Sequence, residues 1–400
     1  MVILCFSATV TFSFAAGKNE VAASLNAESE DAKSSEFEAN DGAALDEKID
    51  AIISGISEED FSSVIEELNL LTGKNRTLKE TIIAFITGES GLNYDTVKSY
   101  ILSRAFALLT ENYDSFIYLV CLIVLLAASN IIICKNNDNI EKSVIFYIYY
   151  PLIVCLVLSL VKSAVDYATA AIKFSTELSE LIFPVMFSVT AVAGNFGVAL
   201  IKPFTVFFVF FTGEAILDFF IPALCFAFAV LAVGNLNDKA NFNELFKTVM
   251  SAFKWSLGLI VGVYSSLLTV EGLSNAAYNG VSVKILKYLS GTGVPIVGGL
   301  IGGSTDIILS AVTLVKNSVG VMAAVTVVFC VGLKGVNGIA YSLSLKLLNS
   351  LLAPASTPRV TKLIIGSCEI ISALAALIFL SGLMFLLTVV FVIKSTSGVI

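Results

Sequence analysis

SFIYLVCLIVLLAASNIIIC, residues 115–134, contains no charged side chain over its whole length. A helix needs about 20 mostly apolar residues to cross the hydrocarbon core of a bilayer, so this stretch predicts a transmembrane span. It also marks a change in composition. Residues 17–114 hold 20 Asp and Glu against 8 Lys and Arg, whereas residues 115–400 hold 12 against 16. The sequence therefore predicts an acidic aqueous segment followed by a multi-span membrane domain at 115–400.

The overall composition supports this division. Hydrophobic residues make up 56% of the chain and charged residues 14%, against roughly 25% charged residues in a soluble domain. We therefore expect an all-α, polytopic integral membrane protein with about six to eight transmembrane or re-entrant helices. The chain has no histidine, which excludes Ser-His-Asp and Cys-His catalysis and imidazole metal ligands. We expect no enzymatic activity, no cofactor, no metal and no nucleic-acid partner.

The first 16 residues, MVILCFSATVTFSFAA, predict a signal peptide. Their short apolar core ends in Ser13-Phe14-Ala15, which fits the small-x-small rule for cleavage, although no Lys or Arg precedes that core. Whether it is cleaved or retained, this segment would carry residues 17–114 out of the cytoplasm.

The exported segment predicts disorder followed by short helices. Residues 17–44 are rich in Ala, Ser, Glu and Asp and have little to bury. One helix is expected at 45–71 and another from Thr77, where Thr77 and Glu80 form a capping-box pattern. A third is expected at 95–109. These amphipathic helices either pack against one another or lie against the membrane or a partner.

The membrane domain alternates apolar and amphipathic segments. Lys135 and Lys142 follow the first span and predict a cytoplasmic loop, because Lys and Arg are enriched on that side. Beyond residue 200 the side of the membrane stays open, since Lys239 indicates the cytoplasm and simple alternation argues against it. A re-entrant hairpin at 203–233 would reconcile the two, and irregular backbone is allowed there only when buried in protein or facing water. The expected spans are 115–134, 143–161, 181–200, 203–233, 255–270, 294–315, 319–333 and 363–393, and the amphipathic stretches include 162–180, 235–254 and 336–353.

Two carboxylates are candidates for an intramembrane site. Glu214 and Asp218 stand four residues apart inside the apolar run 203–233, so they share one helix face. Ionisable residues within spans are costly and mark functional sites by default. The alternative is an interfacial turn, which the flanking Gly213 and Pro222 favour. The same question is raised more weakly by Glu271, Asp306, Lys316 and Glu369.

Four glycines cluster in the apolar segment 294–315. Gly298 and Gly302, like Gly299 and Gly303, form small-xxx-small pairs that allow two helices to approach closely. A broken helix that lines a transport pathway is the alternative. The glycines do not form a phosphate-binding loop, because no Gly-Lys-Ser/Thr follows them.

This part of the chain resembles a known family. The motifs TVEG (269–272), NGVSVK (279–284), VPIVG (294–298) and LVKNSVG (314–320) are similar to those of the stage III sporulation protein AE family. The resemblance implies a membrane subunit of the channel between mother cell and forespore in an endospore-forming bacterium. It implies as partners other membrane subunits, a cytoplasmic ATPase and ring-forming proteins of the intermembrane space. No catalytic residue is implied.

The predicted function is therefore that of a non-enzymatic subunit of this transenvelope channel. It would lie in the mother-cell membrane that surrounds the forespore, with residues 17–114 outside the cytoplasm. The alternative is an autonomous secondary transporter in which the intramembrane acidic residues form the transport site.

Overall fold

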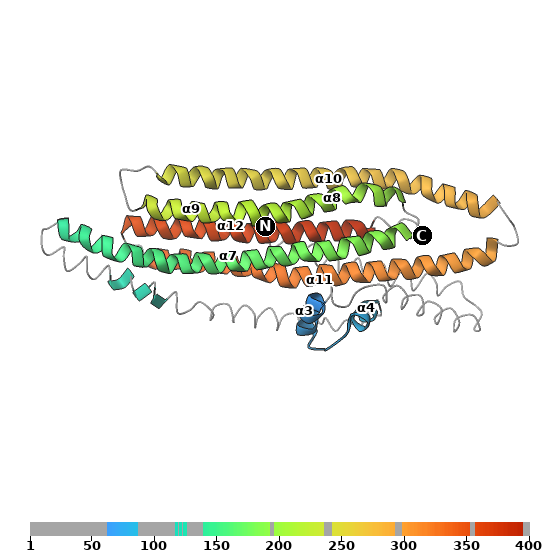
Figure 1. Cartoon of the computed structure of the whole chain (residues 1–400), viewed down its shortest axis with the longest axis horizontal. Coiled ribbons are helices and arrows are strands. Elements are labelled where there is room, and N and C mark those ends of the chain that lie inside the picture. The colour runs from blue at the N-terminus through green and yellow to red at the C-terminus, as the bar shows by residue number, and fades with distance from the viewer. Residues whose placement is uncertain are drawn as a thin grey trace.

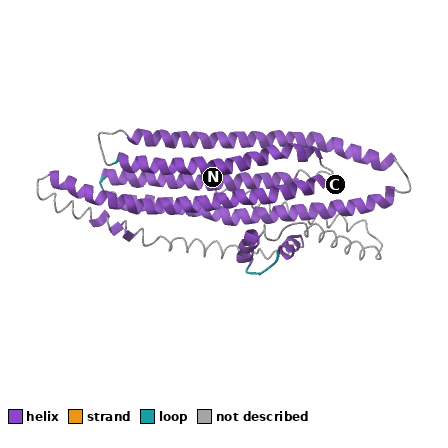
Figure 2. Cartoon of the chain, in the orientation of Figure 1, coloured by secondary structure: helices purple, strands orange, loops and turns teal. Residues whose placement is uncertain are grey.

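The computed structural model describes residues 62–86, 139–192, 196–235, 242–292, 298–352 and 357–394, and a few residues between 117 and 125. Every regular element in these ranges is a helix, as Figure 2 shows. The predicted signal peptide at 1–16, the disordered segment at 17–44, the helix at 95–109 and most of the span at 115–134 lie outside the described residues. The all-α fold class is confirmed.

Among the residues that the structure describes, five long antiparallel rods lie side by side (Figure 1). Successive rods run in opposite directions, and α12 contacts all four others. In its most apolar stretch 67% of the residues are buried, against 11% for α10, so α12 is central and α10 is peripheral. The rods are α7 (Asn139–Val192), α8 (Phe196–Ala215) continued by the π-helix η1 (Ile216–Phe220) and α9 (Ile221–Gly234), α10 (Phe242–Thr292), α11 (Gly298–Leu352) and α12 (Pro358–Lys394).

These rods are long enough and apolar enough to cross a membrane, and the chain is a multi-pass membrane protein. The longest, α11, has 55 residues and therefore measures about 80 Å at about 1.5 Å per residue. The hydrocarbon core of a bilayer is about 30 Å thick. The bundle therefore extends well beyond the hydrocarbon core.

Helix α7 joins segments that the sequence predicts as separate. The spans at 143–161 and 181–200 and the amphipathic stretch at 162–180 were expected as three pieces, but α7 is continuous from Asn139 to Val192. The span predicted at 181–200 is itself divided, because residues 196–200 belong to α8. The amphipathic character of 162–180 is confirmed, because its five charged side chains are exposed and its apolar face is buried. The helix continues through Pro151 and Pro184, which lie inside it, and it packs against α8, α11 and α12. We call the exposed residues Lys162, Asp166, Lys173, Glu177 and Glu180 the α7 charged stripe.

Helix α11 also joins segments that the sequence predicts as separate. It includes the predicted spans at 294–315, from Gly298 onward, and 319–333, together with the amphipathic stretch at 336–353. The helix is unbroken from Gly298, which argues against a broken helix at these glycines. The side chains around Gly298–Gly303 lie outside the described part, so the close helix contact expected there stays a prediction.

The continuity of α7 shows which connections lie at the same end of the bundle. Because α7 makes one passage along the bundle, the start of α7, the end of α9 and the start of α10 lie at the same end (left in Figure 1). The lysine-bearing connections at Lys135–Lys142 and around Lys239 therefore share one end. The re-entrant hairpin at 203–233 is wrong, since 196–234 is one continuous rod.

Glycines of α11 and α12 bring these two helices together in the largest helix–helix contact of the described residues. A Cβ atom added to Gly338 would lie 2.9 Å from the Ala375 Cβ, and one added to Gly335 would lie 2.9 Å from the Phe379 ring. Such distances are shorter than normal van der Waals contact. The glycines are therefore needed for the approach of the helices.

Two short helices, α3 (Ser62–Thr72) and α4 (Leu78–Ile86), contact α11. Leu68 and Ile82 are buried in the same core as the rods. The predicted capping box is confirmed: the Thr77 N–H donates to Glu80 Oε2 at 3.0 Å, and the Glu80 N–H donates to Thr77 Oγ1 at 3.4 Å. Between the helices, Gly73 has a φ of 66°, which favours glycine.

Candidate functional site

Glu214 and Asp218 lie in the middle of a rod rather than at a turn. Pro222 has no N–H, and in an α-helix its ring would clash with the carbonyl four residues earlier. The π-helix η1 precedes it, and the Ile221 N–H donates to the Ile216 carbonyl five residues back. Widening of the helix by one residue absorbs the proline without ending the rod. The interfacial turn that Gly213 and Pro222 favoured is therefore wrong.

Both carboxylates are exposed on an aromatic face. Phe204, Phe207 and Phe211 precede them at helical spacing and are 69%, 66% and 59% exposed. These three residues with Glu214 and Asp218 are called the α8 outer face. A charge that faces lipid at the bilayer centre costs about 2.5–3.5 kcal/mol on insertion scales. We therefore expect water or another protein surface, not lipid chains, to cover the two carboxylates.

Close packing of α8 on α7 shows which part of α7 lies beside Glu214. A Cβ added to Gly213 would collide with the Thr176 side chain, so the two backbones approach closely there. Lys173 and Glu177 flank Thr176 on α7 and form an exposed ion pair at 3.8 Å. Glu214 therefore lies at the same height as part of the α7 charged stripe.

The buried carboxylate among the described residues is Glu271, which lies just beyond the middle of α10. Its side chain is 5% exposed, and the hydroxyl of Thr205 on α8, itself 1% exposed, donates to its Oε1. In the sequence, Glu271 raises the question of an intramembrane site more weakly than Glu214 and Asp218 do. Its seven-residue spacing from Tyr264 on the inward face of α10 was the signal that could have identified it.

Tyr264 forms the second polar contact on this inward face. Its hydroxyl donates to the Met384 carbonyl on α12 at 2.7 Å and lies 2.8 Å from Thr388 Oγ1. Val209 and Leu380 join Tyr264 and Met384 in a small buried apolar cluster. The α8–α10–α12 interface therefore combines apolar packing with two buried polar contacts, one at Glu271 and one at Tyr264.

Among the other candidates, the structure describes the side chain of Glu369 alone. Glu369 is exposed on α12. Asp306 and Lys316 belong to α11, but their side chains lie outside the described part of the chain. Within the described residues no group of three or more His, Cys, Asp or Glu side chains could hold a metal ion. Chemically, the arrangement provides one buried carboxylate that can bind or release a proton and a pair of exposed carboxylates that can bind a cationic group.

Comparison with known proteins identifies the family. The chain matches the stage III sporulation protein AE family over residues 76–396. It is 22% identical over 315 residues to "Stage III sporulation protein AE" of Bacillus subtilis (strain 168), and the alignment covers 78% of this chain and 79% of that protein. No solved structure matches the chain. The match covers all five rods, and the chain therefore belongs to the stage III sporulation protein AE family, which has a role in sporulation.

Proposed function

We propose that the chain is a non-enzymatic membrane subunit of the transenvelope channel between mother cell and forespore, required during endospore formation. The observation that carries this proposal is family membership over residues 76–396, which includes the whole bundle. The proposed location is the mother-cell membrane that surrounds the forespore.

The distribution of lysines supports an orientation for the bundle. Lys135, Lys142 and Lys239 lie in or beside the connections at one end, whereas the connections 193–195 and 293–297 at the other end contain no charged residue. Lys and Arg are enriched in short cytoplasmic loops. The lysine-bearing end is therefore proposed to face the mother-cell cytoplasm, and residues 17–114 to lie on the opposite side.

The α7 charged stripe supports a role in a conduit. From Lys162 to Glu180 it extends over 18 helical steps, about 27 Å, which is close to the thickness of the hydrocarbon core. All five side chains are exposed. Charged residues at membrane depth face water-filled cavities or polar partners. The stripe is therefore proposed to line an aqueous path or to contact a polar subunit.

This orientation assigns the partners to the two ends. The cytoplasmic ATPase of the channel would meet the lysine-bearing end. The ring-forming proteins of the intermembrane space would meet the opposite end and residues 17–114, and other membrane subunits would contact the sides of the bundle.

Purification of the tagged, full-length chain from membranes of sporulating cells tests the proposal. We expect the ATPase and the ring-forming proteins to be recovered with it, and to be lost when sporulation is not induced. Recovery of the chain alone after crosslinking would contradict the proposal.

The buried Thr205–Glu271 pair favours a second candidate function, an autonomous secondary transporter with a proton-binding carboxylate. Reconstituted vesicles that contain the chain alone separate the two candidates. Proton-coupled uptake that disappears in Glu271→Gln would support the transporter, and no uptake is expected from an isolated channel subunit.

A further inference from the structure

Helix α10 presents a stripe of one lysine and four small residues on the side away from the bundle. Lys254, Gly258, Gly262, Ser265 and Thr269 follow one another at helical spacing and are all exposed. We call them the α10 outer face. A Cβ atom added to Gly258 or Gly262 would meet nothing within 4 Å. The stripe therefore leaves room for large side chains of another helix.

The hydroxyls of this face already have acceptors in their own helix. Ser265 Oγ donates to the Gly262 carbonyl at 3.0 Å, and Thr269 Oγ1 donates to the Ser265 carbonyl at 2.8 Å. Such bonds satisfy hydroxyls where water is absent. The face is therefore suited to contact with protein inside the membrane.

Two contacts align the α10 outer face with the α8 outer face along the bundle axis. The rings of Phe220 and Phe253 lie 5.9 Å apart, and Thr205 bonds to Glu271. Between these contacts the two helices run antiparallel at the same heights. Asp218 lies two residues before Phe220 and is therefore at the height of Trp255, two residues after Phe253 and next to Lys254.

The rest of the two faces follows the same alignment. Phe204 precedes Thr205 by one residue and therefore lies within one helical turn of Thr269, beside the Thr205–Glu271 contact. Phe211 lies nine residues before Phe220, which places it at the height of Gly262 by the ring contact, and six residues after Thr205, which places it at the height of Ser265 by the hydrogen bond. The large side chains of one face thus lie within one turn of the small residues of the other.

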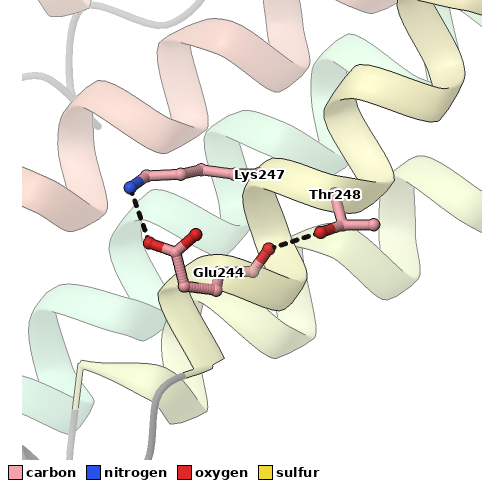
Figure 3. A network of polar contacts seen from close by, with 3 residues as sticks. All are labelled: Glu244, Lys247 and Thr248. Carbon is pink, nitrogen blue, oxygen red and sulfur yellow. Dashed lines mark hydrogen bonds and ion pairs between the residues drawn. The ribbon is translucent and has the colours of Figure 1, made fainter.

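The charges on the two faces are also complementary. Lys254 forms no ion pair within the described residues, and neither do Glu214 and Asp218. Lys247, two turns earlier on α10, differs because it bonds to Glu244 at 2.8 Å on its own helix (Figure 3). The uncompensated charges are positive on α10 and negative on α8.

We propose that the α8 outer face of one copy of this chain binds the α10 outer face of a second copy. Phe211 would enter the space over Gly262, and Lys254 would face Glu214 and Asp218. Copies with the same orientation in one membrane are related by rotation about the membrane normal, which leaves the height of every residue unchanged. Groups that meet between copies must therefore lie at similar heights, and these do to within one helical turn.

The two faces are different surfaces, so the contact is head-to-tail. Such contacts close into rings or continue as open chains. This proposal goes beyond the channel role and does not rest on it, because an autonomous transporter could self-associate in the same way.

Disulfide crosslinking in native membranes tests the contact. In the full-length chain with its seven native cysteines replaced, Phe211→Cys and Gly262→Cys are introduced together and the membranes are oxidised. We expect a ladder of multimers on a non-reducing gel. Each single variant should stay monomeric, and coexpression of the two single variants should give dimers without a ladder.

A matched control uses a residue at the wrong height. Phe226 is an exposed phenylalanine of the same rod, 56% exposed and 15 residues beyond Phe211. Phe226→Cys combined with Gly262→Cys should therefore give no multimers. A ladder from this pair, dimers from a single variant, or monomers only from Phe211→Cys with Gly262→Cys at normal membrane abundance would each overturn the proposal.

Charge reversal tests the polar part of the contact separately. Lys254→Glu should reduce the crosslinked fraction of the Phe211–Gly262 pair several-fold, and Asp218→Lys added to Lys254→Glu should restore it. Lys247→Glu is the control and should leave the fraction unchanged, because Lys247 lies outside the matched faces. An equal loss in Lys247→Glu, or no rescue by Asp218→Lys at normal abundance, would contradict the pairing of Lys254 with the acidic residues.

Discussion

At the scale of single residues, burial separates the acidic side chains into two kinds. Glu214 and Asp218 attract attention in the sequence because they interrupt an apolar run, yet both are exposed. Glu271 is buried and bonded to Thr205. Because an ionisable group in a protein interior depends on its hydrogen-bond partners, substitution of Thr205 should have a larger effect than its size suggests.

Thr205→Val should lower the stability of the folded chain by about 1–3 kcal/mol, since it removes a hydroxyl donor to a buried carboxylate and leaves the shape of the side chain almost unchanged. Thermal unfolding in detergent measures the effect. Thr212→Val is the control: Thr212 is also buried on α8, but its hydroxyl donates to the Phe208 carbonyl of its own helix at 2.7 Å. Equal decreases in unfolding temperature in the two variants would show that the hydrogen bond to Glu271 adds no stability.

Tyr264→Phe should lower the stability of the folded chain by less, about 0.6 kcal/mol, which is the average for hydrogen bonds between membrane helices. The Met384 carbonyl keeps the Thr388 hydroxyl as a donor at 2.8 Å after the tyrosine hydroxyl is removed. Combining Tyr264→Phe with Thr388→Val removes both donors and should produce a larger loss than either change alone. The same thermal assay measures it, and a large loss from Tyr264→Phe alone would contradict this account.

At the scale of the elements, the rods are held together by glycines at which helices nearly touch. The capping box at Thr77 and Glu80 and the amphipathic stretch at 162–180 were predicted from local sequence and are confirmed. The joining of neighbouring segments into α7 and α11 was not predicted. Whether a helix continues through a polar stretch depends on the helices that cover its other face, and these come from distant parts of the chain.

Gly338→Leu should destabilise the α11–α12 contact by about 1–3 kcal/mol, because the larger side chain has no space beside Ala375 and forces the helices apart. The control is Ala376→Leu on α12, which adds bulk at an exposed position next to the contact. Unfolding temperature and the yield of monodisperse protein in detergent report the difference. If both variants lower the unfolding temperature and the yield equally, close packing at Gly338 does not contribute to stability.

At the scale of the whole molecule, the directions of the rods among the described residues assign three connections and the end of α12 to definite ends of the bundle. The connections before α7, between α9 and α10, and between α11 and α12 share one end, and the end of α12 lies at the other (Figure 1). This arrangement follows from the rods themselves and from no assumption about which side is cytoplasmic.

Cysteine accessibility in a cysteine-free background tests the arrangement. Asn137→Cys and Asp238→Cys should react with an impermeant thiol reagent only after the membrane is opened, because both connections are proposed to face the cytoplasm. Asn195→Cys and Ser397→Cys should react without opening of the membrane in non-sporulating cells that express the chain, where this side faces the medium. Opposite behaviour of positions 137 and 238 would contradict the single passage of α7, whereas reversal of all four would change only the proposed orientation.

The sequence by itself determined the fold class, the multi-pass character, the capping box and the family, because hydropathy, helix-start signals and short motifs are properties of neighbouring residues. Only the tertiary structure decided that Glu271 is buried, that Glu214 and Asp218 face outward, and that the lysine-bearing connections share one end. Each of these depends on which faces of α8, α10 and α12 meet. The physical reason is that burial is set by contacts between residues far apart in the chain, which no local pattern records.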